Sequence, residues 1–150
     1  MALESVLLAV GKGDAERAES LAETVVDIAG PAGGAVTLTH VFTTDEFETV
    51  RSQLGYGADS PVDPDEVARR HATTRSIKTE LTAADVEHSV RGSVGPHGAS
   101  IVEIATEIDA GLIIVGGRKR SPAGKAVFGS TAQEVLLNAP CPVTFVREQD

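Results

Sequence analysis

"LIIVGGRKRSPAGKAVFGST", residues 112–131, starts with four apolar residues and ends where a helix is expected to begin. The apolar run Leu112–Val115 predicts a strand that is buried on both faces. Two glycines and a cluster of four Lys and Arg follow it, and Gly-Ser-Thr closes the stretch. A buried strand, a glycine-bearing loop and a helix start are the parts of a βα unit, which belongs to a parallel sheet.

The rest of the chain repeats this alternation of strand and helix. The element order predicts an α/β fold, with a single doubly wound domain over residues 1–150 and a five-stranded parallel sheet covered by helices on both faces. The first and fourth strands are the most apolar and should be central, whereas the third alternates and the fifth follows prolines. A strand order of 3-2-1-4-5 satisfies both conditions. The predicted strands are Ser5–Val10, Ala35–Phe42, Val86–Arg91, Leu112–Val115 and Val143–Val146.

Helix signals lie between these strands. Apolar spacing predicts a helix over about Asp14–Ala29, with Asp14 as its cap and Gly30-Pro31 at its end. Sequences that resemble capping boxes are expected to open the last two helices, at Ser100–Glu103 and Ser130–Gln133.

The segment between the second and third strands is expected to be helical in two places. A short helix should surround Phe47–Leu54. A second should start at Asp63, which can act as N-cap before Pro64, and reach about Leu81. Its apolar face is thin, so we expect this helix to lie outside the main core.

Composition places the chain among soluble globular proteins. It has 150 residues, which suits one domain, and 41% of them are hydrophobic and 23% charged. No apolar run approaches the roughly 18 residues of a membrane span, and the first ten residues do not resemble a signal peptide. The single cysteine, Cys141, excludes an internal disulfide and fits a reducing compartment. We therefore expect a cytoplasmic protein with no membrane partner.

The net charge is −9, and only four residues are lysine. An acidic surface repels nucleic acid and anionic lipid, so we expect neither as a partner. Two interpretations of this acidity stay open. One is a halophile-like surface, whose self-repulsion high salt would screen, and the other is an ordinary acidic cytosolic protein.

A ligand is expected where the direction of winding reverses, between the first and fourth strands. The loop Gly11-Lys12-Gly13 and the loop 116–131 flank that point. The first N–H groups of a helix have no partners within the helix and favour an anion. The sequence thus predicts a polyphosphate or nucleotide site; the alternative is that the cations extend into solvent and Ser130 is only a cap. The residues expected to meet phosphate or add charge are Arg118, Lys119, Lys125, Gly129, Ser130 and Thr131.

Two familiar phosphate-binding motifs do not fit. A P-loop needs a hydroxyl residue after its Gly-Lys, but Ala126 follows Gly124-Lys125, and Lys119 stands where its first glycine belongs. A dinucleotide-binding fingerprint needs a third glycine where this chain has Glu16, whose carboxylate would repel a pyrophosphate.

The glycine spacing of the same loop resembles the nucleotide-binding pattern of the universal stress protein family. That pattern is G-x-x-G, nine residues, then G-[ST], and here Gly116–Lys119, nine residues and Gly129-Ser130 keep its spacing. The stretch Ala139–Val143 is also similar to the family's approach to its last strand. The resemblance implies the strand order given above, with ATP and Mg²⁺ between the loops after strands one and four. It further implies that phosphates and ribose are lined by Gly116, Gly129, Ser130 and Thr131, and adenine by Val10 and Val41.

Two positions depart from the family pattern. The second glycine of G-x-x-G is Lys119 here, and its side chain either obstructs the phosphates or adds a charged contact. The family's aspartate directly after strand one aligns with Gly11, which removes a polar contact worth about 1–3 kcal/mol if it was buried and paired. Asp14, three residues on, is expected at the helix cap and is a poor replacement. Binding of ATP, of another anion or of no ligand stays open.

The resemblance implies a stress-response or signalling module that binds nucleotide and is not a dedicated enzyme. No residue stands out as a general base for water, so any ATP hydrolysis should be slow or incidental. The resemblance also implies a homodimer through the last strand, and the apolar edge Val143–Val146 needs covering. The alternatives are a dimeric regulator without nucleotide and a doubly wound nucleotide-dependent enzyme.

The four histidines do not suggest a catalytic or metal site. His40 and His97 should lie near the carboxyl end of the sheet, and neither has a nucleophile or carboxylate at a convincing spacing. His71 and His88 are expected on exposed faces. No group of His, Cys, Asp and Glu has the spacing of metal ligands.

Overall fold

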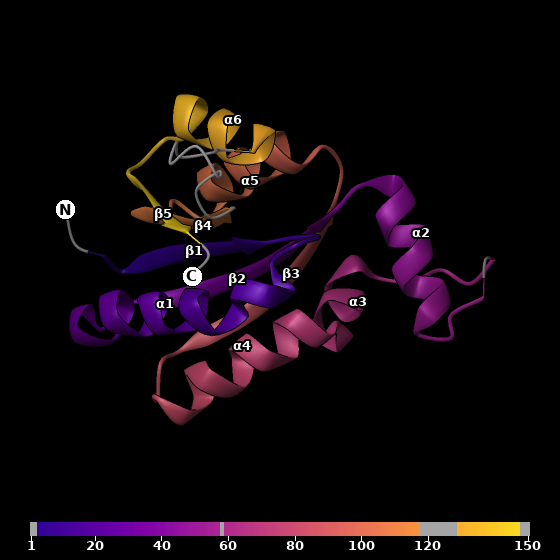
Figure 1. The fold of residues 1–150 in the computed structure, drawn as a ribbon, viewed down its shortest axis with the longest axis horizontal. Helices are drawn as coiled ribbons and strands as arrows, with labels where there is room; N and C mark the ends of the chain where they lie inside the picture. The colour runs from indigo at the N-terminus through magenta and orange to yellow at the C-terminus, as the bar shows by residue number, and fades with distance from the viewer. Residues whose placement is uncertain (1–2, 58, 118–128, 148–150) are drawn as a thin grey trace, which may run out of the picture.

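A five-stranded sheet forms the centre of the computed structural model, which describes residues 3–57, 59–117 and 129–147 (Figure 1). The strands follow the order β3-β2-β1-β4-β5, and every neighbouring pair is parallel. The predicted α/β fold and strand order are confirmed, and the first two strands have the expected bounds. The strands are β1 Ser5–Val10, β2 Ala35–Phe42, β3 His88–Val94, β4 Leu112–Gly117 and β5 Val143–Arg147.

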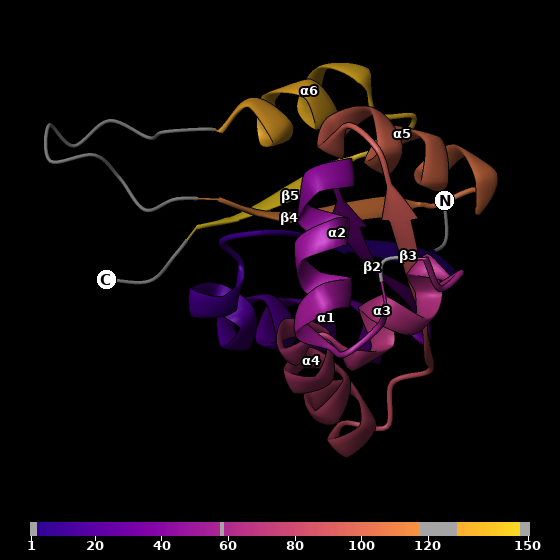
Figure 2. The ribbon, with the colours of Figure 1, turned by 90° about the vertical axis from the view of Figure 1, so that its right-hand side faces the viewer.

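Helices cover both faces of the sheet. Figure 1 shows α1 (Ala18–Ala32) and α4 (Ala72–Ala83) on one face, and α5 (His97–Glu107) and α6 (Ser130–Asn138) on the other. Two further helices, α2 (Thr44–Gln53) and α3 (Pro64–Arg70), stand beside the carboxyl end of β2 and are in front in Figure 2. Because β1 and β4 are parallel neighbours, the loops that follow them start at the same end of the sheet.

Strand β1 is central because it is apolar on both sides. Val6 and Leu8 belong to the apolar cluster that includes α1 and α4, whereas Leu7 and Ala9 belong to the cluster of α5 and α6. All four are at most 3% exposed. Burial of each valine or leucine side chain stabilises the fold by about 1.5–3 kcal/mol, and burial of the smaller alanine side chain contributes less.

The first helix starts and ends later than expected. A 3₁₀ turn, η1 (Ala15–Arg17), precedes α1, and α1 continues through Pro31 to Ala32. The stop is Gly33, whose φ of 66° is left-handed, and the N–H of Gly34 donates to the carbonyl of Ala29. This is a Schellman ending, which satisfies the last carbonyls, so the expectation that Gly30-Pro31 ends the helix was wrong.

The long helix expected from Asp63 to Leu81 is two helices. The chain breaks at His71, whose ψ of 137° is extended, and its Nδ1 accepts a hydrogen bond from the N–H of Thr73 at the start of α4 (3.3 Å). Ile77 and Leu81 are fully buried in the main core beside α1. The expected place outside the core was therefore also wrong, because two apolar residues one turn apart suffice to dock α4.

Both predicted capping boxes are wrong, and the third strand is displaced. Helix α5 begins at His97, before Ser100, and Ser100 is buried inside it. Helix α6 begins at Ser130 with Gly129 as N-cap, and no side chain within the described ranges caps it. Strand β3 begins at His88 and not at Val86, because its residues His88–Val94 pair with Val36–Phe42 of β2.

The two edges of the sheet differ. The edge strand β3 is covered by α3, where the N–H of Gly92 donates to the Asp65 carboxylate (2.7 Å) and the Pro64 carbonyl lies directly over Gly92. Strand β5 is the opposite edge. Its residues Val143, Thr144 and Phe145 are only partly buried. On α6, which packs against β5, Leu136 and Leu137 are 43% and 75% exposed.

Candidate functional site

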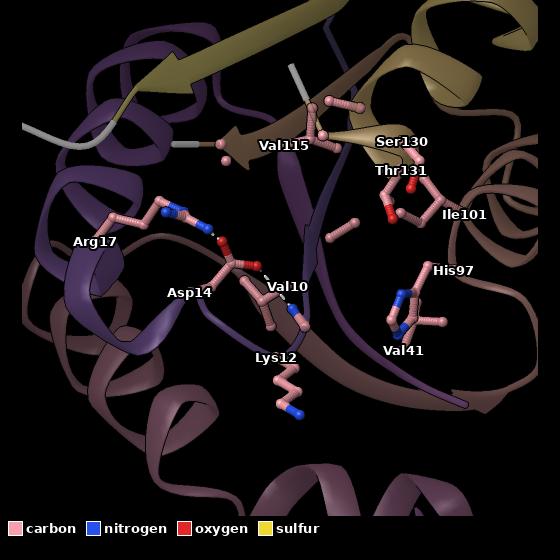
Figure 3. Close-up of a pocket in the computed structure, with 16 residues that line it drawn as sticks. Val10, Lys12, Asp14, Arg17, Val41, His97, Ile101, Val115, Ser130 and Thr131 are labelled. Carbon is pink, nitrogen blue, oxygen red and sulfur yellow. Dashed lines mark hydrogen bonds and ion pairs between the residues drawn. The ribbon is translucent and has the colours of Figure 1, made fainter. Parts of the chain in front are cut away.

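A cavity of about 240 Å³ lies at the carboxyl edge of the sheet, between the loops that follow β1 and β4 (Figure 3). This is the point where the winding of the fold reverses, as expected from the strand order. We call it the β1–β4 cavity. Its lining comes from β1, β2, β4, α5, α6 and the turn before α1, so it is assembled from the whole length of the chain.

Most of the residues predicted for the site come together here. The residues from that prediction that line the cavity are Val10, Gly11, Val41, Gly116, Gly129, Ser130 and Thr131. The other three, Arg118, Lys119 and Lys125, lie outside the described residues. The glycines, valines and hydroxyl residues of the predicted site therefore line one cavity, whereas its three cationic residues fall outside the described part of the chain.

One wall of the cavity is apolar. Val10, Val41, Ile101 and Val115 contribute to it, and each is at most 4% exposed (Figure 3). They come from the ends of β1, β2 and β4 and from α5. Such a wall suits the flat face of an apolar or aromatic group, with polar groups around it to fix orientation.

The N-terminus of α6 forms another side, next to Ile101 and across from Val10 and Val41. Gly129 is the N-cap, with extended backbone (φ −65°, ψ 165°), and a Cβ placed on it would meet no atom within 4 Å. Ser130 and Thr131 follow, and Figure 3 shows both hydroxyls beside the cavity. Unpaired N–H groups and hydroxyls at a helix start bind anions.

An ion pair between Asp14 and Arg17 closes a third side. Arg17 Nε lies 2.5 Å from Asp14 Oδ1, and the N–H of Gly11 donates to Asp14 Oδ2 (2.8 Å; Figure 3). Both side chains are about nine-tenths buried. A Cβ on Gly116 would lie 2.8 Å from Arg17 Nε, so the pair sits directly against this glycine. The expectation that Asp14 caps the helix was wrong, because its carboxylate makes no cap bond and lines the cavity.

Burial raises the pKa of the Asp14 carboxyl above its ordinary value. The Gly11 N–H, the Arg17 guanidinium and, more weakly, His97 oppose that rise. The carboxylate is thus held in a desolvated place by its hydrogen bonds and its counter-ion. Removing either partner of such a buried pair is costly.

His97 connects the cavity to α2. It is the first residue of α5, it lines the cavity, and its Nε2 lies 2.7 Å from Glu46 Oε1. Glu46 also accepts the Thr43 N–H (2.8 Å) in the capping box of α2. Burial raises the pKa of the Glu46 carboxyl, but these hydrogen bonds outweigh it, so that the pKa lies below its ordinary value.

His40 and His71 lie next to the site, at the end of β2. The His40 ring is 3% exposed and is stacked on Phe42 with centroids 4.2 Å apart. The His71 ring lies 4.3 Å from it and is half-buried, so its expected place on an exposed face was wrong. His88 is also partly buried. Burial, with His71 nearby, lowers the pKa of His40 to about 3.

Acidification is expected to destabilise the protein through His40. Its pKa is about 3 in the fold and about 6.5 in the unfolded chain, so below pH 6.5 the unfolded chain binds a proton that the folded ring does not. This contribution is complete above pH 6.5. It falls by up to about 1.4 kcal/mol per pH unit between pH 6.5 and 3. Denaturant unfolding at pH 7, 5.5 and 4 measures the loss.

The matched variant is His40→Phe, which keeps an aromatic ring in the stack and removes the titrating group. The slope of its free energy of unfolding against pH should be smaller than that of the wild type by the contribution of about one bound proton. Carboxylates such as Glu46 contribute equally to both proteins, so the difference isolates His40. Equal slopes in the two proteins would contradict this assignment.

Several lining residues were not predicted from the sequence, namely Lys12, Asp14, Arg17, His97 and Ile101. The spacing of Asp14 and Arg17, three residues apart in a helical turn, was an available signal for an ion pair. Nothing local to His97 indicates its bond to Glu46, which lies 51 residues earlier. Within the described ranges, no group of three or more His, Cys, Asp and Glu could hold a metal ion. None of the described helices is long and apolar enough to cross a membrane.

Comparison with known proteins identifies the family. The family model described as "Universal stress protein family" matches residues 3–147. A universal stress protein of Mycolicibacterium smegmatis is 33% identical over 79 residues, which is 52% of this chain and 61% of that protein. The chain thus matches less than two thirds of that relative's length.

Solved structures agree. A universal stress protein from Archaeoglobus fulgidus is 28% identical, with a TM-score of 0.65 over 95% of this chain and 97% of that one. Another, from the same organism and in complex with dAMP, is 23% identical, with a TM-score of 0.62 over 97% and 99% of the two chains. Because the family model spans nearly the whole chain, this protein belongs to the universal stress protein family.

Proposed function

We propose that this protein is a stress-response or signalling module that binds ATP, with Mg²⁺, in the β1–β4 cavity. The observation that carries the proposal is the pairing of an apolar wall with a helix N-terminus across one cavity at the switch point of the sheet. The same fold holds dAMP in the relative from Archaeoglobus fulgidus, which supports an adenine nucleotide here.

The two ends of the cavity suit the two ends of a nucleotide. Adenine would lie against Val10 and Val41, which are apolar and buried. The phosphates would meet Gly129, Ser130 and Thr131, where no side chain of the described residues caps the helix. Arg118, Lys119 and Lys125 would add positive charge from the loop.

Asp14 supplies a carboxylate near the place where the family pattern has one. Gly11 has no side chain, but the Asp14 carboxylate returns to the Gly11 N–H and lines the cavity. It accepts bonds from Gly11 and Arg17 and retains acceptor capacity, since a carboxylate has about four lone-pair sites. We infer that Asp14 accepts a hydrogen bond from the nucleoside, in compensation for the missing aspartate.

The module would bind and signal rather than catalyse. Among the described residues that line the cavity, Asp14 carries the only carboxylate; Arg17 neutralises it, and its remaining acceptor site is assigned above to the nucleoside. A base that activates water must reach it with a free lone pair. Turnover of bound ATP should therefore be far below ordinary enzymatic rates of about 1–10³ s⁻¹.

Calorimetry of the full chain with Mg-ATP tests the binding, at low and high salt because the loop is cationic and the surface acidic. We expect saturable heat that weakens as salt rises, and adenine nucleotide in gently purified protein by mass spectrometry. Absence of both nucleotide and heat would mean a regulator without nucleotide. Rapid release of phosphate would instead place the protein among enzymes.

We also propose a homodimer through the edge of β5. The other edge, β3, is covered by α3 through the bond from Gly92 N–H to Asp65. The side of β5 carries partly buried apolar residues, and α6, which packs against β5, exposes Leu136 and Leu137. An open edge next to exposed leucines favours pairing with a second copy.

Sedimentation equilibrium is expected to give twice the 15.5 kDa of the chain. Leu136→Glu should shift the equilibrium toward monomer, because it places a charge on the half-exposed side of α6, the helix that packs against β5. Glu103→Gln on α5 serves as a control for a charge change away from that edge. A wild-type protein that sediments as a monomer at all concentrations would contradict the dimer.

A further inference from the structure

A second cavity, of about 290 Å³, lies on the other side of the end of β2. Its walls come from His40 and Phe42 of β2, from α2, and from His71 between α3 and α4. We call it the His40 cavity. No described residue of β4, α5 or α6 lines it, and Lys12 is its one lining residue in common with the β1–β4 cavity.

One wall of the His40 cavity is formed by three aromatic rings, those of His40, Phe42 and His71. The His40 ring stacks on Phe42 with an angle of 17° between their planes, and the His71 ring is tilted by 49° at 4.3 Å from His40. Val50 of α2 adds an aliphatic surface. Flat π faces and an aliphatic side chain favour a planar ligand that can stack.

The His40 ring has unused hydrogen-bonding capacity. Neither Nδ1 nor Nε2 makes a hydrogen bond of good geometry with the described residues, although the side chain is almost fully buried; a weak interaction with the Val41 backbone slightly opposes the lowering of the His40 pKa. A neutral imidazole offers one N–H donor and one acceptor, and leaving both unmade in a buried place costs about 1–3 kcal/mol each. Native proteins rarely leave such groups unpaired, so the cavity beside this ring calls for a polar occupant.

His71 adds a donor of defined identity. Its Nδ1 accepts the Thr73 N–H, so the proton of the neutral ring is on Nε2. Burial lowers the pKa of both His40 and His71, which keeps these rings uncharged at neutral pH. The walls thus offer neutral donors and an acceptor rather than charge.

The charges at the rim do not select an ion. Lys12 is cationic, whereas Asp45 and Glu46 are acidic, and Glu46 is already bonded to Thr43 and His97. With both signs present around neutral walls, neither a phosphate nor a simple cation is favoured. The described residues also contain no metal-binding group.

We propose that the His40 cavity is a second binding site, for an uncharged planar heterocycle of the nucleobase or nicotinamide type. The ligand stacks against the aromatic wall and exchanges hydrogen bonds with the ring nitrogens of His40 and His71. Because both His40 nitrogens are fully buried, the ring must turn to bring one of them to the ligand. The site is separate from ATP binding in the β1–β4 cavity and does not depend on it.

Histidine ring spectroscopy of the full chain tests this site. Two-bond ¹H–¹⁵N NMR spectra report each imidazole, and the probes are adenine, uracil and nicotinamide. We expect at least one probe to shift the His40 and His71 nitrogens saturably, while His88, bonded to the Val86 carbonyl at the start of β3, stays unchanged. The shifts should persist in Gly116→Val, which fills the β1–β4 cavity, so failure of the ATP proposal leaves this result intact.

His40→Phe is the decisive variant, because it keeps the stack and removes both nitrogens. The probe that shifts His71 should bind it about tenfold more weakly, as expected for one lost hydrogen bond. Three outcomes overturn the proposal. They are no shift with any probe, shifts that vanish in Gly116→Val, and unchanged affinity in His40→Phe.

Discussion

Replacement of Gly92 by alanine is expected to lower the free energy of unfolding by about 3 kcal/mol or more. A Cβ on Gly92 would lie 2.0 Å from the Pro64 carbonyl oxygen, 2.4 Å from its carbon and 2.9 Å from the Asp65 nitrogen. These are backbone atoms, so no side-chain rotation relieves the overlap. Helix α3 would have to move away from β3, which would also break the bond from Gly92 N–H to Asp65.

Denaturant unfolding measures this loss, and Gly30→Ala is the matched control. Gly30 lies within α1, and a Cβ there meets nothing within 4 Å, so alanine should stabilise the helix by about 0.5–1 kcal/mol. The displaced α3 should also expose the edge of β3, so Gly92→Ala protein should aggregate more readily on partial unfolding. If Gly92→Ala unfolds within 0.5 kcal/mol of wild type, α3 does not pack on this strand as described.

The strands were predictable because burial dictates them. The run Val6–Val10 is apolar at every position, and only a central strand with helices on both faces buries all of it. Once the central strands are fixed, the winding rules allow few arrangements, and the observed order is among them. The same rules locate the β1–β4 cavity, because its main-chain frame follows from topology.

The helix ends were less predictable because capping side chains have competing partners. Asp14 is a good cap by residue type, but Arg17 and the Gly11 N–H take its carboxylate. Ser100 looked like a cap and is buried one turn inside α5. At Asp14 two other local partners, and at Ser100 burial within the fold, outweighed a capping preference of about 1 kcal/mol.

The polar residues of the site were missed for a related reason. His97 and Glu46 are 51 residues apart, and their bond depends on how α2 stands beside α5. The contact of Arg17 with Gly116 likewise joins distant parts of the chain. A single sequence shows spacing along the chain but not such approaches between elements.

Replacement of Gly116 by valine is expected to weaken Mg-ATP binding at least about 100-fold, which corresponds to about 3 kcal/mol. The new Cβ would lie 2.8 Å from Arg17 Nε, 2.9 Å from its Cδ and 3.0 Å from Asp14 Oδ1. Arg17 is a flexible side chain and can move, so the fold should survive. Its movement would separate the buried pair with Asp14, and the valine methyls would occupy space at the proposed phosphate end.

Calorimetry with Mg-ATP measures the effect, with thermal unfolding as the check that the protein is folded. Gly30→Ala, distant from the cavity, should bind like wild type. Asp14→Asn separates the two causes, because it keeps the shape of the side chain and removes its charge. A loss of about tenfold in Asp14→Asn would assign part of the effect to the carboxylate. Wild-type affinity in Gly116→Val would show that ATP, if it binds, does not occupy the β1–β4 cavity, because a nucleotide there must pass over this glycine and the pair that rests on it.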